Sequence, residues 1–332
     1  MAGIWSVCGQ WKTDRKWLSA RKGKDVHMLE KSLEEIAVTE GGLAAERVRK
    51  RNKLVRVAML LSIVIYFICF ECISVGDSVS FYFLKCLVLV LAYLVFLKYI
   101  RKYLSRIHDI LEVECDPYKM EEALAYFYIK NGIAGKESRK RMYNILMARA
   151  IILQGDFDRA YDVLMGVDRD CLRKGYWFCT YHDCMRMYYC SKDDVQVLSD
   201  MKKYFFQLSK DYSLRKRHRK FMEKEIQIIN IHLSMMKGEL GDYEIASQKA
   251  DWKKGANITL VSHRWMDARA HYIKNEVEAA KADCRYVIEN GNRLYYTNLA
   301  REMVQLISGA GSSPAPPPAE NISPAPAGKV RP

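Results

Sequence analysis

The chain has 332 residues, of which 50% are hydrophobic and 28% charged, and its formal net charge is +14. A chain of this length is long enough to build a hydrophobic core, and the length suggests one to three domains. The average composition is that of a soluble protein. The apolar residues are unevenly spread, however, so the average does not exclude a membrane protein.

Residues 1–56 form a basic N-terminal segment that we expect to be partly helical. Trp5, Trp11 and Trp17 stand among basic residues, at a six-residue spacing that does not place them on one helix face. Residues 1–24 therefore fit an interfacial anchor or a disordered arm. The alternative is that they are translated from a start codon upstream of a native start at Met28. Residues 25–56 are amphipathic, which predicts a helix that leads into the next segment.

Two apolar runs follow, VAMLLSIVIYFICFECISV at 57–75 and VSFYFLKCLVLVLAYLVFL at 79–97. A helix of 19 residues is about 28 Å long, close to the ~30 Å hydrocarbon core of a bilayer. Only residues 76–78 separate the runs, so the sequence predicts a two-helix transmembrane hairpin with an extracytoplasmic turn. The alternative is a buried hairpin inside a soluble all-helical domain.

Each run contains one charged residue, Glu71 in the first and Lys85 in the second. Both residues fall toward the outward ends of the predicted spans, and an unpaired charge in lipid is costly. We therefore expect these intramembrane charges to pair or share water near the outer surface, or to reach that surface independently.

The cations that flank the two runs predict their orientation. The turn at 76–78 has no Lys or Arg, so the positive-inside rule places both termini in the cytoplasm of a multi-pass cell-membrane protein. Residues 98–112 are expected to form a juxtamembrane helix. The flanking cations are Arg47, Arg49, Lys50, Arg51, Lys53 and Arg56 before the first run, and Lys98, Arg101, Lys102 and Arg106 after the second.

Residues 113–307 predict a cytoplasmic helical domain. Asp116 and Pro117 have the character of an N-cap and a first helical residue. About ten amphipathic helical patterns follow, separated by short turn signals and without an alternating strand pattern. The predicted fold class is therefore all-α, with the transmembrane hairpin joined to about ten helices. Residues 308–332 are Pro/Ala-rich and predict a disordered tail.

Three turns in this domain resemble one another, at 155–160, 241–246 and 275–280, and the last two are 34 residues apart. A small residue stands twelve positions before the final alanine of each turn. Small residues at both points allow two antiparallel helices to approach closely, as a repeated helical hairpin requires. The pairs are Ala148 with Ala160, Ser234 with Ala246, and Ala268 with Ala280.

This spacing resembles the tetratricopeptide repeat, whose 34-residue unit places small residues at its eighth and twentieth positions and a glycine at the turn. The three units depart from the family because they lack its early aromatic residue and its closing proline. The layout of two spans and a degenerate repeat domain also resembles uncharacterised membrane proteins of Gram-positive bacteria. The resemblance implies a TPR-like α-solenoid at 113–307.

The resemblance further implies a concave groove lined by the first helix of each unit. Two cations at equivalent positions with aromatic neighbours suit an acidic peptide or a C-terminal carboxylate. The alternative is that these residues are ordinary packing or solvated surface. Carried over by position, the groove residues are Arg149, Ile152, Met235, Trp265, Arg269 and Tyr272.

A basic run at 215–220 is a second candidate binding feature. It fits a solvated helix face, or a patch for lipid headgroups, an acidic partner or nucleic acid. Nucleic acid is not favoured, because no aromatic residues interleave with these cations. The basic patch consists of Arg215, Lys216, Arg217, Arg219 and Lys220.

Catalytic signatures are absent from the sequence. It contains no phosphate-binding glycine loop, no HExxH, no nucleophile elbow and no dinucleotide fingerprint. His263, Asp267 and His271 share one helix face at a spacing of four residues, which makes them a weak candidate for a metal site. We expect no cofactor and no enzymatic activity.

The leading hypothesis is a membrane-anchored cytoplasmic scaffold or adaptor that binds a protein partner through the TPR-like groove. The alternative is a module that binds anionic lipid or nucleic acid through its basic patches. An uncharacterised enzyme that uses His263, Asp267 and His271 is the third hypothesis.

Overall fold

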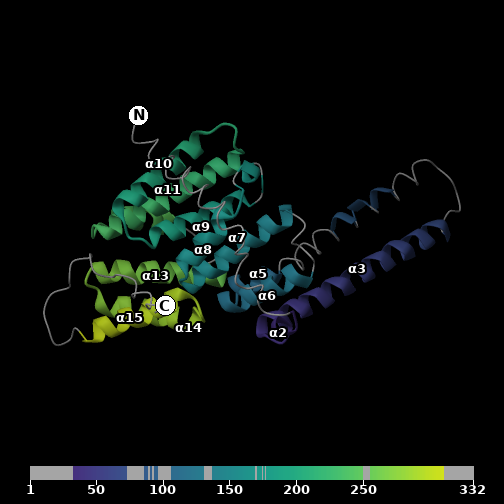
Figure 1. The fold of residues 1–332 in the computed structure, drawn as a ribbon, viewed down its shortest axis with the longest axis horizontal. Helices are drawn as coiled ribbons and strands as arrows, with labels where there is room; N and C mark the ends of the chain where they lie inside the picture. The colour runs from purple at the N-terminus through teal and green to yellow at the C-terminus, as the bar shows by residue number, and fades with distance from the viewer. Residues whose placement is uncertain are drawn as a thin grey trace, which may run out of the picture.

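The computed structural model describes residues 33–72, 86–88, 90–91, 93–95, 106–130, 137–168, 170–173, 175, 177–249 and 255–309. Over these residues the chain is all-α, as the sequence predicts. The helices form a body of packed hairpins, from which the long helix α3 projects (Figure 1). The predicted tail at 308–332 falls almost wholly outside the described residues.

The first two helices of the described residues are α2 (Leu33–Ala37) and α3 (Glu40–Cys72). Val38 and Thr39 separate the two helices, and the Thr39 hydroxyl donates to the carbonyl oxygen of Ile36 at 2.8 Å. The first turns of α3 pack against α6 (Pro117–Lys130). There the Gly41 amide donates to Oε2 of Glu122 at 3.0 Å, so α3 is attached to the body at its N-terminal end.

Gly41 lies where α3 and α6 approach most closely. A Cβ at this position would lie 2.4 Å from the Lys119 carbonyl oxygen and 2.8 Å from the Ala123 amide nitrogen, both of them backbone atoms. We therefore expect Gly41→Ala to lower the free energy of unfolding by about 1–3 kcal/mol through overpacking. Denaturant unfolding measures this loss, and hydrogen exchange locates it in α3 and α6.

Gly241 provides the matched control for this prediction. It is the first residue of α12, and a Cβ built there meets nothing within 4 Å. Gly241→Ala should leave stability unchanged or raise it slightly, because alanine restricts the unfolded chain. Equal losses in the two variants would contradict a close helix approach at Gly41.

The predicted transmembrane hairpin is the main correction. In the described part of the chain, no helix has both the length and the apolar composition that crossing a bilayer requires. The run at 57–75 is not a separate element. Its described residues are the second half of α3, a helix of 33 residues whose first half is charged and packs on protein. Of the run at 79–97, only 86–88, 90–91 and 93–95 are described.

Several expectations are wrong together with the hairpin. They are the integral two-span membrane partner, the multi-pass localisation in the cell membrane and the transmembrane part of the fold class. Glu71 falls within α3, whereas Lys85 lies outside the described residues, so their pairing is not described. Beyond its contact with α6, α3 exposes apolar side chains, including Leu60, Leu61 and Ile65.

The body consists of helices joined by short turns. Asp116 confirms its predicted role as a cap, because its Oδ1 accepts from the Lys119 amide at 2.9 Å and Pro117 begins α6. The helices of the body other than α6 are α5 (Arg106–Glu112), α7 (Glu137–Gln154), α8 (Phe157–Met165), the 3-10 turn η3 (Asp170–Leu172), α9 (Phe178–Cys190), α10 (Val195–Lys210), α11 (Lys216–Met236), α12 (Gly241–Lys249), α13 (Asn257–Ile273), α14 (Val277–Asn290) and α15 (Tyr295–Gly309).

Many neighbouring helices of the body pack against each other, as in the pairs α6–α7, α7–α8, α10–α11, α13–α14 and α14–α15. Helix α7 contacts both α8 and α9, and α9 contacts both α10 and α11. One hydrophobic cluster runs through these helices from Ile36 to Ile307. A smaller cluster of Met235, Tyr243 and Ala270 joins α11, α12 and α13. The body is therefore continuous from its first hairpin to its last.

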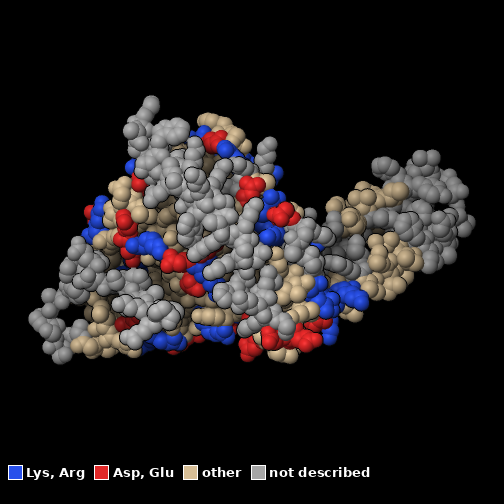
Figure 2. All heavy atoms as spheres, viewed as in Figure 1, with Lys and Arg blue, Asp and Glu red and all other residues tan. Residues whose placement is uncertain are grey.

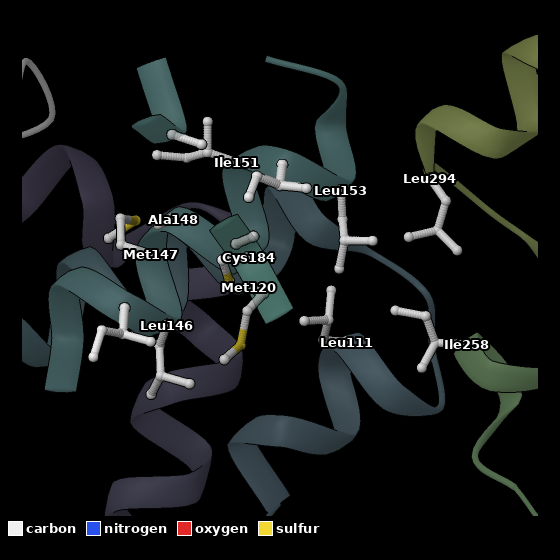
Figure 3. Packing of buried hydrophobic residues seen from close by; sticks show 14 of the residues in the cluster. Leu111, Met120, Leu146, Met147, Ala148, Ile151, Leu153, Cys184, Ile258 and Leu294 are labelled. Carbon is white, nitrogen blue, oxygen red and sulfur yellow. The ribbon is translucent and has the colours of Figure 1, made fainter. Parts of the chain in front are cut away.

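The two ends of the body also meet. Asn257 Nδ2, at the start of α13, donates to the Val113 carbonyl at 3.1 Å, and Asn292 Nδ2 donates to the Glu114 carbonyl at 2.9 Å. Ile258 and Leu294 lie opposite Leu111 of α5 in the same core (Figure 3). A solenoid unit contacts only its neighbours. This body instead closes its last hairpins onto its first helices.

The repeated small residues occupy buried positions in two of the three hairpins. Ala148 and Ala160 of α7–α8 are fully buried, as are Ala268 and Ala280 of α13–α14. The turns of these hairpins contain a left-handed residue at the same place, Gly155 with φ +91° and Asn275 with φ +61°. In α11–α12 the left-handed residue is instead Gly238, with φ +75°, so this hairpin turns at a different position.

Candidate functional site

The six predicted groove residues do not form one surface. Ile152, Met235 and Trp265 are buried in the hydrophobic clusters, at 0%, 1% and 9% exposure. Arg149 and Arg269 are half-buried. Arg149 acts electrostatically on His108 of α5 and Cys184 of α9, whereas Arg269 belongs to α13.

Three of these side chains therefore serve the core. They were assigned to a groove by their positions in the resemblance to the repeat, and their apolar character buries them where helices pack together. A binding role for Arg149, Arg269 and Tyr272 stays a prediction.

The predicted metal cluster is divided between two carboxylates. His263 Nδ1 lies 3.8 Å from Oδ1 of Asp267, while His271 Nδ1 lies 2.8 Å from Oδ2 of Asp283 on α14. Tyr243 of α12 donates to Asp267. In the described part of the chain, no three potential ligands gather closely enough to hold a metal ion. The contact between Tyr243 and Asp267 joins α12 to α13, and the contact between His271 and Asp283 joins α13 to α14. These residues therefore hold the helices together.

The basic run at 215–220 divides into two sides on α11. Arg217 Nε donates to Nε2 of His218 at 3.3 Å. His218 is fully buried, and its ring stacks on Phe178 of α9 with 4.6 Å between the ring centroids. Burial lowers the pKa of His218, so its imidazole is neutral at pH 7 and can accept from Arg217. His218 thereby attaches α11 to α9, whereas the bond that it accepts from Arg217 lies within α11.

Three other cations of the run surround a surface hollow, whereas Arg215, the N-cap of α11, is not among the residues that line it. Lys216, Arg219 and Lys220 lie on one face of α11, at the spacing of successive helical turns. Together with Ser209 and Glu223 they line a hollow of about 230 Å³ at the junction of α10 and α11. This volume admits a charged side-chain group, since sites for whole small molecules are larger.

Arg219 has a distinctive environment in this hollow. Its guanidinium carbon lies 4.6 Å from the centroid of the Tyr212 ring, a cation–π distance. Its Nε is buried and lacks a hydrogen-bond partner among the described residues. An unsatisfied buried donor costs about 1–3 kcal/mol, so this nitrogen is an unmet hydrogen bond within the part of the chain that the structure describes.

The electrostatic balance of the hollow is positive. Three cations face one carboxylate, Glu223, and none of the three forms an ion pair with any carboxylate that the structure describes. Elsewhere on the body, Lys and Arg are interspersed with Asp and Glu (Figure 2). The hollow therefore has uncompensated positive charge, and one of its cations lies over the exposed ring of Tyr212.

The sequence indicated the cations of this site but not its other parts. A helix over 216–236 would have grouped Lys216, Lys220 and Glu223 through their spacing. Ser209, which lines the hollow from α10, and Tyr212, which contacts Arg219 from the preceding loop, could not be assigned from the sequence. No signal in the sequence indicated that α10 and α11 leave a recess between them.

Comparison with known proteins provides no match to a protein-family model, to a curated protein or to a solved structure. The class of protein that the fold and the site define is therefore an all-helical body with a basic surface hollow. The resemblance to the tetratricopeptide repeat stays a prediction.

Proposed function

We propose that this chain is a helical scaffold that binds another protein and recognises an acidic segment of that protein in the hollow beside α11. The observation that carries the proposal is the set of three cations, Lys216, Arg219 and Lys220, without carboxylate partners among the described residues. Carboxylates of an acidic segment are the groups that such cations bind in protein complexes.

The form of the body supports a binding role. One hydrophobic cluster connects its helices, and the first and last hairpins are joined by hydrogen bonds. The guanidinium of Arg219 lies over the Tyr212 ring, with 4.6 Å between its carbon and the ring centroid. A site built on packed helices loses little conformational freedom on binding, so more of the interaction energy remains as affinity.

A labelled acidic peptide tests the proposal. The full-length chain is titrated with a fluorescein-labelled peptide of about ten residues rich in Asp and Glu, and binding is followed by fluorescence anisotropy. We expect binding that weakens as salt rises, because exposed charges are screened. The double variant Lys216→Gln/Lys220→Gln should lose about tenfold in affinity, since each exposed charge contributes up to about 1 kcal/mol.

The double variant Lys130→Gln/Lys237→Gln is the matched control, because it removes the same charge from exposed lysines at the ends of α6 and α11. It should bind the peptide as the unchanged chain does. Equal losses in both double variants would show that net charge, and not the hollow, attracts the peptide. A single-stranded oligonucleotide that binds more tightly than the peptide would favour the nucleic-acid alternative.

A further inference from the structure

We infer that the hollow beside α11 recognises a phosphate monoester, so that the acidic segment of the partner is a phosphorylated one. This inference rests on the proposed function and adds the chemical group that the site selects. It concerns Lys216, Arg219 and Lys220 together with the two other residues that line the hollow, Ser209 and Glu223.

Charge is the first argument for phosphate. Three cations and the single carboxylate of Glu223 leave two positive charges around one recess. A phosphoserine or phosphothreonine carries about −1.5 to −2 at pH 7, whereas an Asp or Glu side chain carries −1. A phosphate monoester therefore balances the hollow with one group, while carboxylates need two side chains in a recess of about 230 Å³.

The geometry of Arg219 is the second argument. Its guanidinium is held over the Tyr212 ring, and its buried Nε has no acceptor among the described residues. A guanidinium presents donors in a planar fork that matches two oxygens of one phosphate. Lys216 and Lys220 stand one helical turn apart on the same face as Arg219 and supply point charges for the remaining oxygens.

The surroundings of Arg219 also limit its alternatives inside the chain. The nearby carboxylate of Glu223 lines the same hollow but does not form an ion pair with Arg219. Ser209 donates its hydroxyl to the Phe206 carbonyl at 2.8 Å, so that proton is already used within α10. Neither of these two residues therefore occupies the guanidinium of Arg219.

Three matched peptides test the inference with the full-length chain. They share one Gly/Ser-rich sequence of about ten residues with flanking Asp residues and differ at the central position, which is phosphoserine, glutamate or serine. Anisotropy should give an affinity for the phosphoserine peptide about tenfold above that for the glutamate peptide, and the serine peptide should bind most weakly. The extra charge and the paired oxygens account for this ratio.

Two variants assign the preference to Arg219. Arg219→Lys keeps the charge but removes the planar fork, so the ratio between the phosphoserine and glutamate peptides should fall to the part that the extra charge of the phosphate supplies. Arg219→Gln removes both the charge and the fork, so it should weaken binding of both peptides and lower the ratio at least as far. Circular dichroism of each variant checks that the helices remain folded, because both changes remove the contact with Tyr212.

The outcomes separate this inference from the proposed function. Equal affinity for the phosphoserine and glutamate peptides would overturn the phosphate inference and leave the acidic-segment scaffold in place. Failure of both peptides to bind would overturn both. Inorganic phosphate should compete at least tenfold more weakly than the phosphoserine peptide. Equal competition would show that the hollow takes free phosphate and not a phosphorylated segment.

Discussion

Replacing Arg186 by methionine is expected to lower the free energy of unfolding at pH 8 by about 3–5 kcal/mol, as when a buried ion pair loses one partner. Arg186 of α9 donates to Glu225 of α11, and its Nη2 lies 2.5 Å from Oδ1 of Asp183. Glu225 is only 3% exposed. Without the guanidinium, the folded state would hold a buried carboxylate with no cation beside it.

The loss should depend on pH because of Glu225. Burial raises the pKa of Glu225 to about 7, against the opposing effect of Arg186. One cation cannot neutralise both Glu225 and Asp183, so the more buried carboxylate retains its proton to higher pH. The folded state thus binds this proton more tightly than the unfolded state, whose pKa is near 4.5.

The sign of the pH dependence follows from this difference. The stabilisation from the Glu225 proton is complete below pH 4.5 and is lost as pH rises through about 7. Between pH 5 and pH 8, the unfolding free energy should fall by about 2–3 kcal/mol on account of this group. Glu225→Gln should remove this part of the pH dependence, and Arg186→Met should cost less at pH 5 than at pH 8.

Urea denaturation at pH 5 and pH 8 measures these effects. Arg173→Met is the matched control, since Arg173 pairs with Asp211 at the surface and its side chain is 50% exposed. Such a pair contributes about 0–1 kcal/mol, so this variant should lose little stability. Similar losses for Arg186→Met and Arg173→Met would contradict the buried ion pair between α9 and α11.

Replacing Phe178 by alanine is expected to cost about 3–5 kcal/mol of unfolding free energy, the range for deleting a buried aromatic side chain. Phe178 is the first residue of α9 and is 2% exposed. Its ring lies between His182, with centroids 4.2 Å apart, and His218, with centroids 4.6 Å apart. The substitution therefore leaves a cavity where α9 meets the first turn of α11.

This cavity should also affect the basic hollow. His218 directly precedes Arg219, so a shift of His218 into the empty space moves the guanidinium relative to Lys216 and Lys220. We expect the affinity for the phosphoserine peptide to fall together with stability. Phe206→Ala is the control, because Phe206 lies on α10 with 55% exposure and its loss should cost about 0.5 kcal/mol or less.

Thermal and urea unfolding compare the two phenylalanine variants, and anisotropy at a temperature where both are folded compares their peptide binding. Loss of stability in Phe178→Ala with unchanged affinity would show that the hollow does not depend on the α9–α11 contact. Equal stability of the two variants would contradict the burial of Phe178.

The transmembrane prediction shows where local sequence reasoning failed. Hydropathy in a window of about twenty residues treats an apolar run as an independent element. In the structure, Val57 belongs to the same helix as Gly41, and that helix begins with charged turns that pack on α6. The charged residues before the apolar run also favour a helix, so one helix continues from Glu40 to Cys72 without a boundary at the start of the run. The change from charged to apolar residues therefore does not mark where a helix begins.

The local features of the chain could be predicted from its amino-acid sequence. Helical periodicity and the scarcity of proline predicted an all-α chain, and Asp116 with Pro117 marked the start of α6. The spacing of Ala148, Ala160, Ala268 and Ala280 indicated positions that are fully buried in two hairpins. These features are local because they depend on residues within one helix or one hairpin.

Only the tertiary structure decided which helices meet across the chain. Ile152 and Trp265 lie in the core. His263 lies near Asp267, whereas His271 pairs with Asp283, so the two histidines do not share a site. The side chain of Asn257 donates to the carbonyl of Val113. The tertiary structure also left a recess between α10 and α11, where Arg219 and Tyr212 meet. The physical reason is that the packing of distant helices depends on the shapes of all their side chains together, which a periodic pattern along one segment does not contain.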